Sequence, residues 1–82
     1  MKLKKGIILN SYNGEFTAYD SANSTMHELN ESAFYILDNM VKNVNKDKMA
    51  SMYAMHFELS IDQAREDISQ FLDLLKSRAI IE

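Results

Sequence analysis

The 82-residue sequence contains no cysteine, and this absence excludes several kinds of chemistry at once. Without thiols the chain has no disulfide framework, no iron–sulfur cluster, no cysteine nucleophile and no Cys-based zinc finger. Only two glycines are present, Gly6 and Gly14, so no glycine-rich loop is available to hold a phosphate group. We therefore expect a protein of a reduced, cytoplasmic setting that uses no cofactor.

Long apolar runs and an excess of positive charge are missing as well. The apolar run behind the basic start covers only residues 6–9, which is too short for a signal peptide or a membrane span. The net charge is −3, and Lys2, Lys4 and Lys5 supply three of the nine bases, which leaves residues 6–82 with six bases against twelve acids. A chain this acidic repels phosphates, so we expect neither nucleic acid nor a membrane among its partners.

The residues that are present point to a folded protein. Hydrophobic residues make up 46% of the chain and charged residues 26%, without a low-complexity segment. This composition is typical of a globular protein rather than of a disordered tail. A domain usually needs roughly 100 residues and seldom fewer than about 50, so we expect one compact domain, 1–82, with a modest core.

The dipeptide Asn13-Gly14 indicates a β-hairpin, because a two-residue type I′ turn needs positive φ at both central residues. Residues 21–24 indicate a second turn, which leaves Thr25–Leu29 as a short third strand. Pairing outward from the first turn places four apolar residues on one face, which we expect to be the core face: Ile7, Leu9, Phe16 and Ala18.

Three helices are expected after these strands. Asn30 and Asn45 are good N-caps and predict helices over Glu31–Asn43 and Lys46–Phe57, with apolar residues at three- and four-residue spacing. The segment Ser60-Ile61-Asp62-Gln63 matches a capping box, in which the Ser and Gln side chains each bond the other residue's backbone N–H. The order of elements predicts an α+β fold of winged helix-turn-helix type, with a three-stranded antiparallel sheet followed by three helices.

The third helix, expected over Ile61–Arg78, has an apolar stripe with a polar flank on either side. The apolar stripe consists of Ile61, Ala64, Ile68, Phe71, Leu72 and Leu75. The first flank consists of Arg65, Ser69, Leu72 and Lys76, and the second flank of Gln63, Asp67, Gln70, Leu74 and Arg78.

Two motifs resemble a known family. The segment Leu29-Asn30-Glu31-Ser32-Ala33-Phe34-Tyr35-Ile36-Leu37 resembles the strand-to-helix junction of the PqqD-like peptide chaperones, also called RiPP recognition elements. Residues 67–81, with Phe71-Leu72, Leu75 and the pair Ile80-Ile81, resemble that family's closing pattern. Many members have a glycine where the first helix ends and another before the last apolar pair. This chain has Asn43-Val44-Asn45 and Ala79 there, and of these Asn is the residue better suited to a left-handed conformation.

The resemblance implies a non-catalytic protein that binds the leader segment of a ribosomally made precursor peptide and presents it to a separate modifying enzyme. In this family the leader adds as an extra strand beside the third strand, between that strand and the third helix. A terminal strand suits this role, because its outer edge has unpaired N–H and C=O groups. The candidate leader-binding residues are Thr25, Met26, His27, Glu28 and Leu29 on the strand and Arg65, Ile68, Ser69, Leu72, Asp73 and Lys76 on the helix.

Two details of this hypothesis depend on choices between alternatives. We favour the first flank of the third helix, because Leu72 offers an apolar anchor between charged neighbours. A proline at His27 should weaken binding if its N–H faces the leader. The family serves radical SAM enzymes, peptidases of lasso-peptide pathways and cyclodehydratases, and the stand-alone form favours a radical SAM partner.

Other functions fit the sequence less well. A DNA-binding winged-helix regulator would share the architecture, but residues 60–78 contain four acids and three bases, which suits a recognition helix poorly. An acyl carrier attaches its prosthetic group to a serine at a helix start, whereas Ser21 lies between two expected strands. His27 and His56 lack further zinc ligands at a recognisable spacing, and Glu66-Asp67 do not converge as an acid/base pair. We therefore expect no metal site and no catalytic residues.

Overall fold

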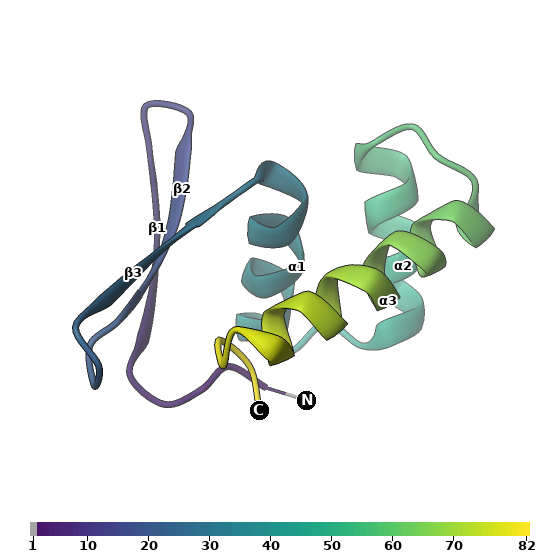
Figure 1. The fold of residues 1–82 in the computed structure, drawn as a ribbon. Coiled ribbons are helices and arrows are strands. Elements are labelled where there is room, and N and C mark those ends of the chain that lie inside the picture. Colours follow the sequence, from purple (N-terminus) through teal and green to yellow (C-terminus); the bar gives the residue numbers. More distant parts are fainter. Residues whose placement is uncertain (1) are drawn as a thin grey trace.

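The computed structural model describes residues 2–82 and contains three strands followed by three helices (Figure 1). The strands form one antiparallel sheet in the order β1-β2-β3, and all helices lie on the same side of it. This arrangement confirms the expected α+β fold of winged helix-turn-helix type. The elements are β1 (Ile7–Tyr12), β2 (Glu15–Asp20), β3 (Thr25–Leu29), α1 (Glu31–Val41), α2 (Lys46–His56) and α3 (Ile61–Ser77).

The hairpin of β1 and β2 has the turn and register that its sequence predicts. Asn13 and Gly14 have φ values of 56° and 81°, as a type I′ turn requires. Leu9 lies opposite Ala18, which is fully buried, so the expected core face is confirmed. Four cross-strand pairs of this register are Ser11 with Phe16, Leu9 with Ala18, Ile8 with Tyr19 and Ile7 with Asp20.

The same register buries a charged residue that the hydrophobic pattern does not predict. Asp20 faces the core side of the sheet and is only 3% exposed. Its carboxylate accepts hydrogen bonds from Asn23 Nδ2 at 2.9 Å and from Lys4 Nζ at 3.0 Å. These two bonds lower the pKa of Asp20 to about 2, so the carboxylate stays ionised although it is buried.

Each helix begins at the N-cap residue expected for it. The side-chain oxygens of Asn30 and Asn45 accept backbone N–H groups at 2.8 Å in both cases, and Ser60 Oγ accepts the N–H of Gln63 at 3.1 Å. Only this half of the expected capping box is present. Gln63 Nε2 donates to Asp67 Oδ1 at 2.8 Å, one turn further along α3, instead of turning back to Ser60.

The helices end slightly earlier than expected, because residues with left-handed backbone follow them. α1 stops at Val41 rather than Asn43, and Asn43 itself has a φ of 59°. α2 stops at His56 and α3 at Ser77, one residue short of the expected ends. Beyond α3, Ala79 has a φ of 56°, so this alanine adopts a left-handed conformation that favours glycine.

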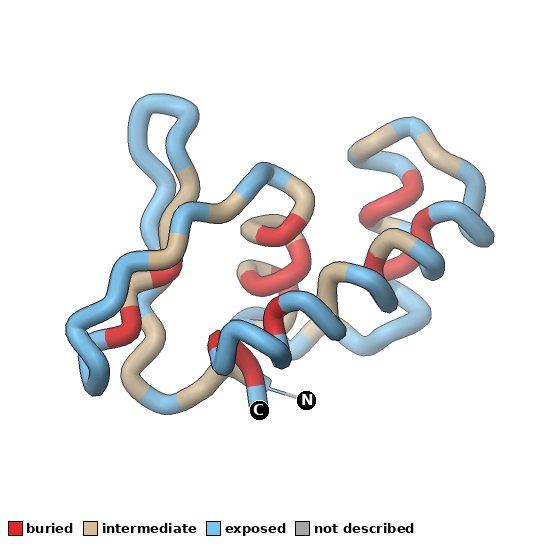
Figure 2. The backbone as a smooth tube through the Cα atoms, in the orientation of Figure 1, coloured by how far each residue is buried: buried red, intermediate tan, exposed pale blue. Residues whose placement is uncertain are grey.

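The core consists of two buried clusters that meet at α1. Figure 2 shows buried segments along α1, on β2 and on the inward sides of α2 and α3. Met40, Phe71 and Leu72 pack against both clusters and so join them. The sheet-side cluster contains Ala18, Ala33, Leu37, Leu75, Ile80 and Ile81, and the helix-side cluster contains Ile36, Met49, Ala50, Tyr53, Ala54, Ala64 and Ile68.

The two ends of the described chain lie side by side, as Figure 1 shows. Leu3 and Ile81 form an antiparallel bridge, and the N–H of Lys4 donates to the carbonyl oxygen of Ile80 at 3.0 Å. The side chains of Ile80 and Ile81 are buried in the sheet-side cluster. The expectation that the apolar tail packs back onto the protein is therefore confirmed.

Candidate functional site

The outer edge of β3 carries backbone groups without a strand partner among residues 2–82. The residues that flank a two-residue turn form a hydrogen-bonded pair, and bonded and non-bonded pairs alternate along an antiparallel ladder. It follows that His27 exchanges its backbone hydrogen bonds with Ala18 of β2. The N–H and C=O groups of Met26 and Glu28 instead point outward, where an added strand can bond to them.

His27 does not meet the condition under which a proline there would weaken leader binding. The N–H of His27 faces β2, so a proline at His27 would disturb the sheet and would not test the free edge. The positions that test the edge are Met26 and Glu28.

The side chains of β3 divide between the two faces of the sheet. His27 and Leu29 are half-buried on the inner face, as their alternation predicts. Met26 is 59% exposed on the outer face, together with Glu28, and Thr25 is exposed at the start of the strand. An extended peptide beside β3 would therefore meet a polar inner position, an apolar outer position and an acidic outer position.

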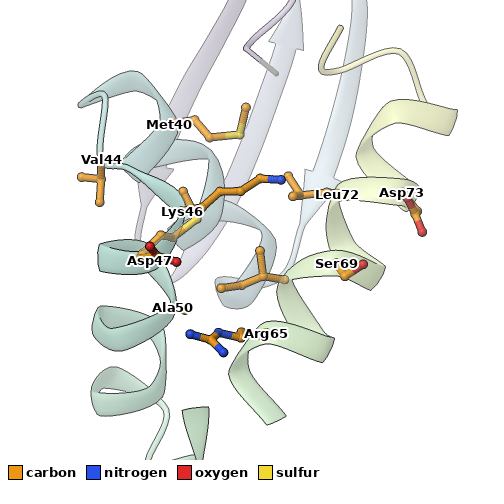
Figure 3. A pocket seen from close by; sticks show the side chains of 11 residues that line it. Met40, Val44, Lys46, Asp47, Ala50, Arg65, Ser69, Leu72 and Asp73 are labelled. Carbon is orange, nitrogen blue, oxygen red and sulfur yellow. The ribbon is translucent and has the colours of Figure 1, made fainter. Parts of the chain in front are cut away.

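The first flank of α3 lies against α2 and not beside β3. A groove of about 440 Å³ runs along the line where α2 and α3 meet, and Met40 and Val44 line it near the end of α1. Figure 3 shows Lys46 extending from α2 toward Leu72, and Arg65 extending from α3 toward α2. Five of the six candidate residues on α3 line this groove, namely Arg65, Ile68, Ser69, Leu72 and Asp73.

The flank favoured above for the leader thus lines the side of α3 that faces α2. Ile68 is buried in the helix-side cluster, and Leu72 is half-buried and packs against both clusters. Lys76 is exposed on the same flank, one turn further along the helix. Sequence periodicity defines the two flanks but cannot tell which one faces the sheet, because that depends on the rotation of α3 in the fold.

Asp67, on the second flank of α3, lies near the beginning of α1. The hydroxyl of Tyr53 on α2 donates a hydrogen bond to Asp67 Oδ2, with 3.4 Å between the two oxygen atoms. Burial raises the pKa of Tyr53, and the side chain of Ser32, in the first turn of α1, opposes this shift. Asp67, Tyr53 and Ser32 thus lie together, and Asp67 is not among the residues that line the groove.

Leu74 is the residue of this second flank that stands out. It is 41% exposed, although a leucine of the same helix, Leu75, is almost completely buried. The sequence alone places Leu74 on the second flank, but whether it can contact a bound peptide depends on where this flank lies in the fold. Arg78 and Gln70 are exposed on the same flank, so it offers one apolar and two polar side chains.

The two histidines lie in different environments. His27 is on the inner face of β3, whereas His56 at the end of α2 approaches Glu31, with Nε2 at 2.8 Å from Oε2. The ring of His56 also stacks on Tyr35, with ring centroids 4.6 Å apart. Within residues 2–82, no three His, Asp or Glu side chains are grouped closely enough to hold a metal ion. In the same part of the chain, no helix has the length and apolarity needed to cross a membrane.

Comparison with known proteins identifies relatives at the level of family and fold. The sequence model of the family described as coenzyme PQQ synthesis protein D (PqqD) matches residues 15–81. The structure titled TbiB1 in complex with the TbiA(beta) leader peptide is similar with a TM-score of 0.87 at 13% identity, over 100% of this chain and 95% of that one. Lasso peptide synthetase B1 complexed with the leader peptide has a TM-score of 0.83 at 18% identity, over 96% and 93%. No curated protein matches the sequence.

Proposed function

Because the chain belongs to the PqqD family, we propose that it binds the leader segment of a ribosomally made precursor peptide and carries it to a separate modifying enzyme. The observation that carries this proposal is the free edge of β3. The outward N–H and C=O groups of Met26 and Glu28 can each exchange a pair of hydrogen bonds with an extended peptide. Two proteins of the same fold are described in complex with leader peptides, which supports the proposal.

The peptide would lie between β3 and the second flank of α3. Leu74 is the exposed apolar group on that flank, and Gln70 and Arg78 can hydrogen-bond to polar leader side chains. On the strand, Thr25–Leu29 would supply the backbone contacts. The proposed leader site thus consists of the second flank of α3, in place of the first, and the five strand residues.

The expected affinity suits a carrier. Ordering a disordered leader costs about 2 to 5 kcal/mol, so a dissociation constant near micromolar, or about −8 kcal/mol, is expected. By holding the leader while it docks on the enzyme, the protein would raise the effective concentration of the core peptide at the active site. This role requires no catalytic group on the carrier itself.

The remaining parts of the proposal concern the setting. We propose that residues 1–82 act as a single leader-binding domain in the cytoplasm, and that the enzyme served is a radical SAM enzyme. The DNA-binding alternative gains no support from the structure. The exposed side of α3 carries three acids, Asp62, Glu66 and Asp73, which would repel the phosphates of DNA.

A two-dimensional amide NMR titration with the leader peptide encoded beside the gene tests the proposal. We expect saturable shifts at Thr25–Leu29 and on the second flank of α3, with much smaller shifts in the groove that contains Arg65 and Ser69. Shifts confined to that groove would contradict the proposed site. A flat titration of a well-dispersed spectrum would contradict leader binding by the isolated protein.

A further inference from the structure

The outer face of the sheet carries two rows of side chains that cross all three strands. In the first row Ile8 of β1 lies opposite Tyr19, and Tyr19 lies opposite Met26 of β3. Ile8 and Met26 are 56% and 59% exposed, so this apolar row has no cover among residues 2–82. The second row is polar and consists of Asn10, Thr17 and Glu28.

Both rows end at the residues whose backbone groups are free. Met26 ends the apolar row and Glu28 ends the polar row, and these two residues expose their N–H and C=O groups to an added strand. A peptide residue bonded opposite either of them projects its side chain to the same outer face, about 5 Å from its partner. The two rows therefore continue into any fourth strand.

The surroundings of Glu28 favour a cation. A hollow of about 240 Å³ beside it is lined by Gly14, Glu15, Phe16, Thr17, Glu28 and Leu29, with two carboxylates and no base. Within residues 2–82, neither Glu15 nor Glu28 takes part in a side-chain hydrogen bond or an ion pair.

We propose that the leader carries a large apolar residue opposite Met26 and a lysine or arginine opposite Glu28, two residues apart and both on the outer face. This inference rests on the proposed function, because it assumes a leader strand on β3. The order of the two residues reports the direction of the strand. In an antiparallel addition the basic residue precedes the apolar one, and in a parallel addition it follows.

Selection from a displayed library of random 12-residue peptides tests this inference without knowledge of the natural leader. On the wild-type protein we expect enrichment of a basic and an apolar residue at a spacing of two. On Glu28→Lys we expect an acidic residue to replace the basic one while the apolar residue is retained. Each matched position should change affinity by up to about fivefold, the upper end of the range for cross-strand pairs.

Two further variants make the outcome decisive. Glu66→Lys introduces the same charge change on an exposed residue of α3 away from the strand edge, and it should leave the wild-type pattern unchanged. Glu28→Pro removes a free edge N–H and should reduce all enrichment. Edge-dependent enrichment without the apolar and basic pair would overturn this inference and leave the proposed function standing. No enrichment on any folded variant would overturn both.

Discussion

Ala79 shows how a single residue can hold a conformation that its side chain disfavours. Its φ of 56° lies in the left-handed region, where an L-residue with a Cβ atom is strained by about 1 kcal/mol. The residue follows α3 and leads directly into Ile80 and Ile81, which are buried. The burial of these two isoleucines maintains the strained turn.

We therefore predict that Ala79→Gly stabilises the protein by about 0.5 kcal/mol, because relief of about 1 kcal/mol of strain exceeds the extra chain entropy that glycine loses on folding. Glycine removes the Cβ clash and leaves the buried tail in place. Urea denaturation followed by circular dichroism measures the change. Ala22→Gly is the matched control, because Ala22 is exposed and is not among the residues with positive φ, so it should lose a few tenths of a kcal/mol. An unchanged or lower stability of Ala79→Gly would contradict the strain argument.

Asp20 makes the stability of the protein depend on pH. Its pKa falls from 3.8 to about 2 on folding, so its contribution to stability is fully present above about pH 4 and is lost as the pH falls through about 2. Asp20→Asn lacks this titration. We predict that the stability difference between wild type and Asp20→Asn shrinks between pH 5 and pH 2 in urea denaturation. A difference that stays constant over this interval would rule out the lowered pKa, and Asp73→Asn serves as an exposed control.

At the scale of the element, the alternation of hydrogen bonds in β3 distinguishes two neighbouring positions. Glu28→Pro should weaken leader binding about fivefold and leave the fold intact, because it removes one outward N–H. His27→Pro should instead lower the free energy of unfolding by about 1 to 3 kcal/mol, since the N–H it removes bonds to Ala18 of β2. Titration calorimetry and thermal unfolding separate these effects, and Glu28→Ala controls for the lost carboxylate. The opposite pattern would reverse our assignment of the edge.

The two flanks of α3 can be separated by one matched pair of variants. Leu74→Asp and Ser69→Asp each place a new carboxylate on an exposed position of α3, on opposite sides of the helix. We predict that Leu74→Asp weakens leader binding about tenfold or more, because it replaces an apolar contact by an unpaired charge. Ser69→Asp should bind like the wild type. Loss of binding only in Ser69→Asp would restore the first flank as the leader site.

At the scale of the whole molecule, the features that the sequence predicts are those determined by neighbouring residues. Asn13-Gly14 determines the hairpin register, and Asn30, Asn45 and Ser60 determine where the helices begin. These signals act within three or four residues, so each can be evaluated on its own.

Features that depend on distant residues were not predictable in the same way. Asp20 is buried, and one of its charged partners, Lys4, lies 16 residues away along the chain. The rotation of α3 depends on contacts such as Tyr53 to Asp67, which join two helices. Periodicity therefore gives the apolar stripe of α3 except for Ile61, which is 38% exposed, but it cannot decide how the two flanks are placed relative to the sheet.

The C-terminal tail packs back onto the sheet beside the beginning of the chain. Ile80 is completely buried between the sheet, α1 and the end of α3, and its carbonyl oxygen accepts the N–H of Lys4. This packing fixes α3 relative to the sheet and therefore the distance between β3 and Leu74. The proposed leader site would in this sense be a property of the whole fold.

We predict that Ile80→Ala lowers the free energy of unfolding by about 2 to 5 kcal/mol, because it leaves a cavity in the sheet-side cluster. Ile8→Ala removes the same atoms from a residue that is 56% exposed, and it should cost less than about 1 kcal/mol. Urea denaturation at pH 7 measures both values. If the tail fixes α3, the Ile80→Ala protein should also bind the leader more weakly under conditions in which it remains folded. Equal costs for the two variants would show that the tail does not hold the sheet and α3 together.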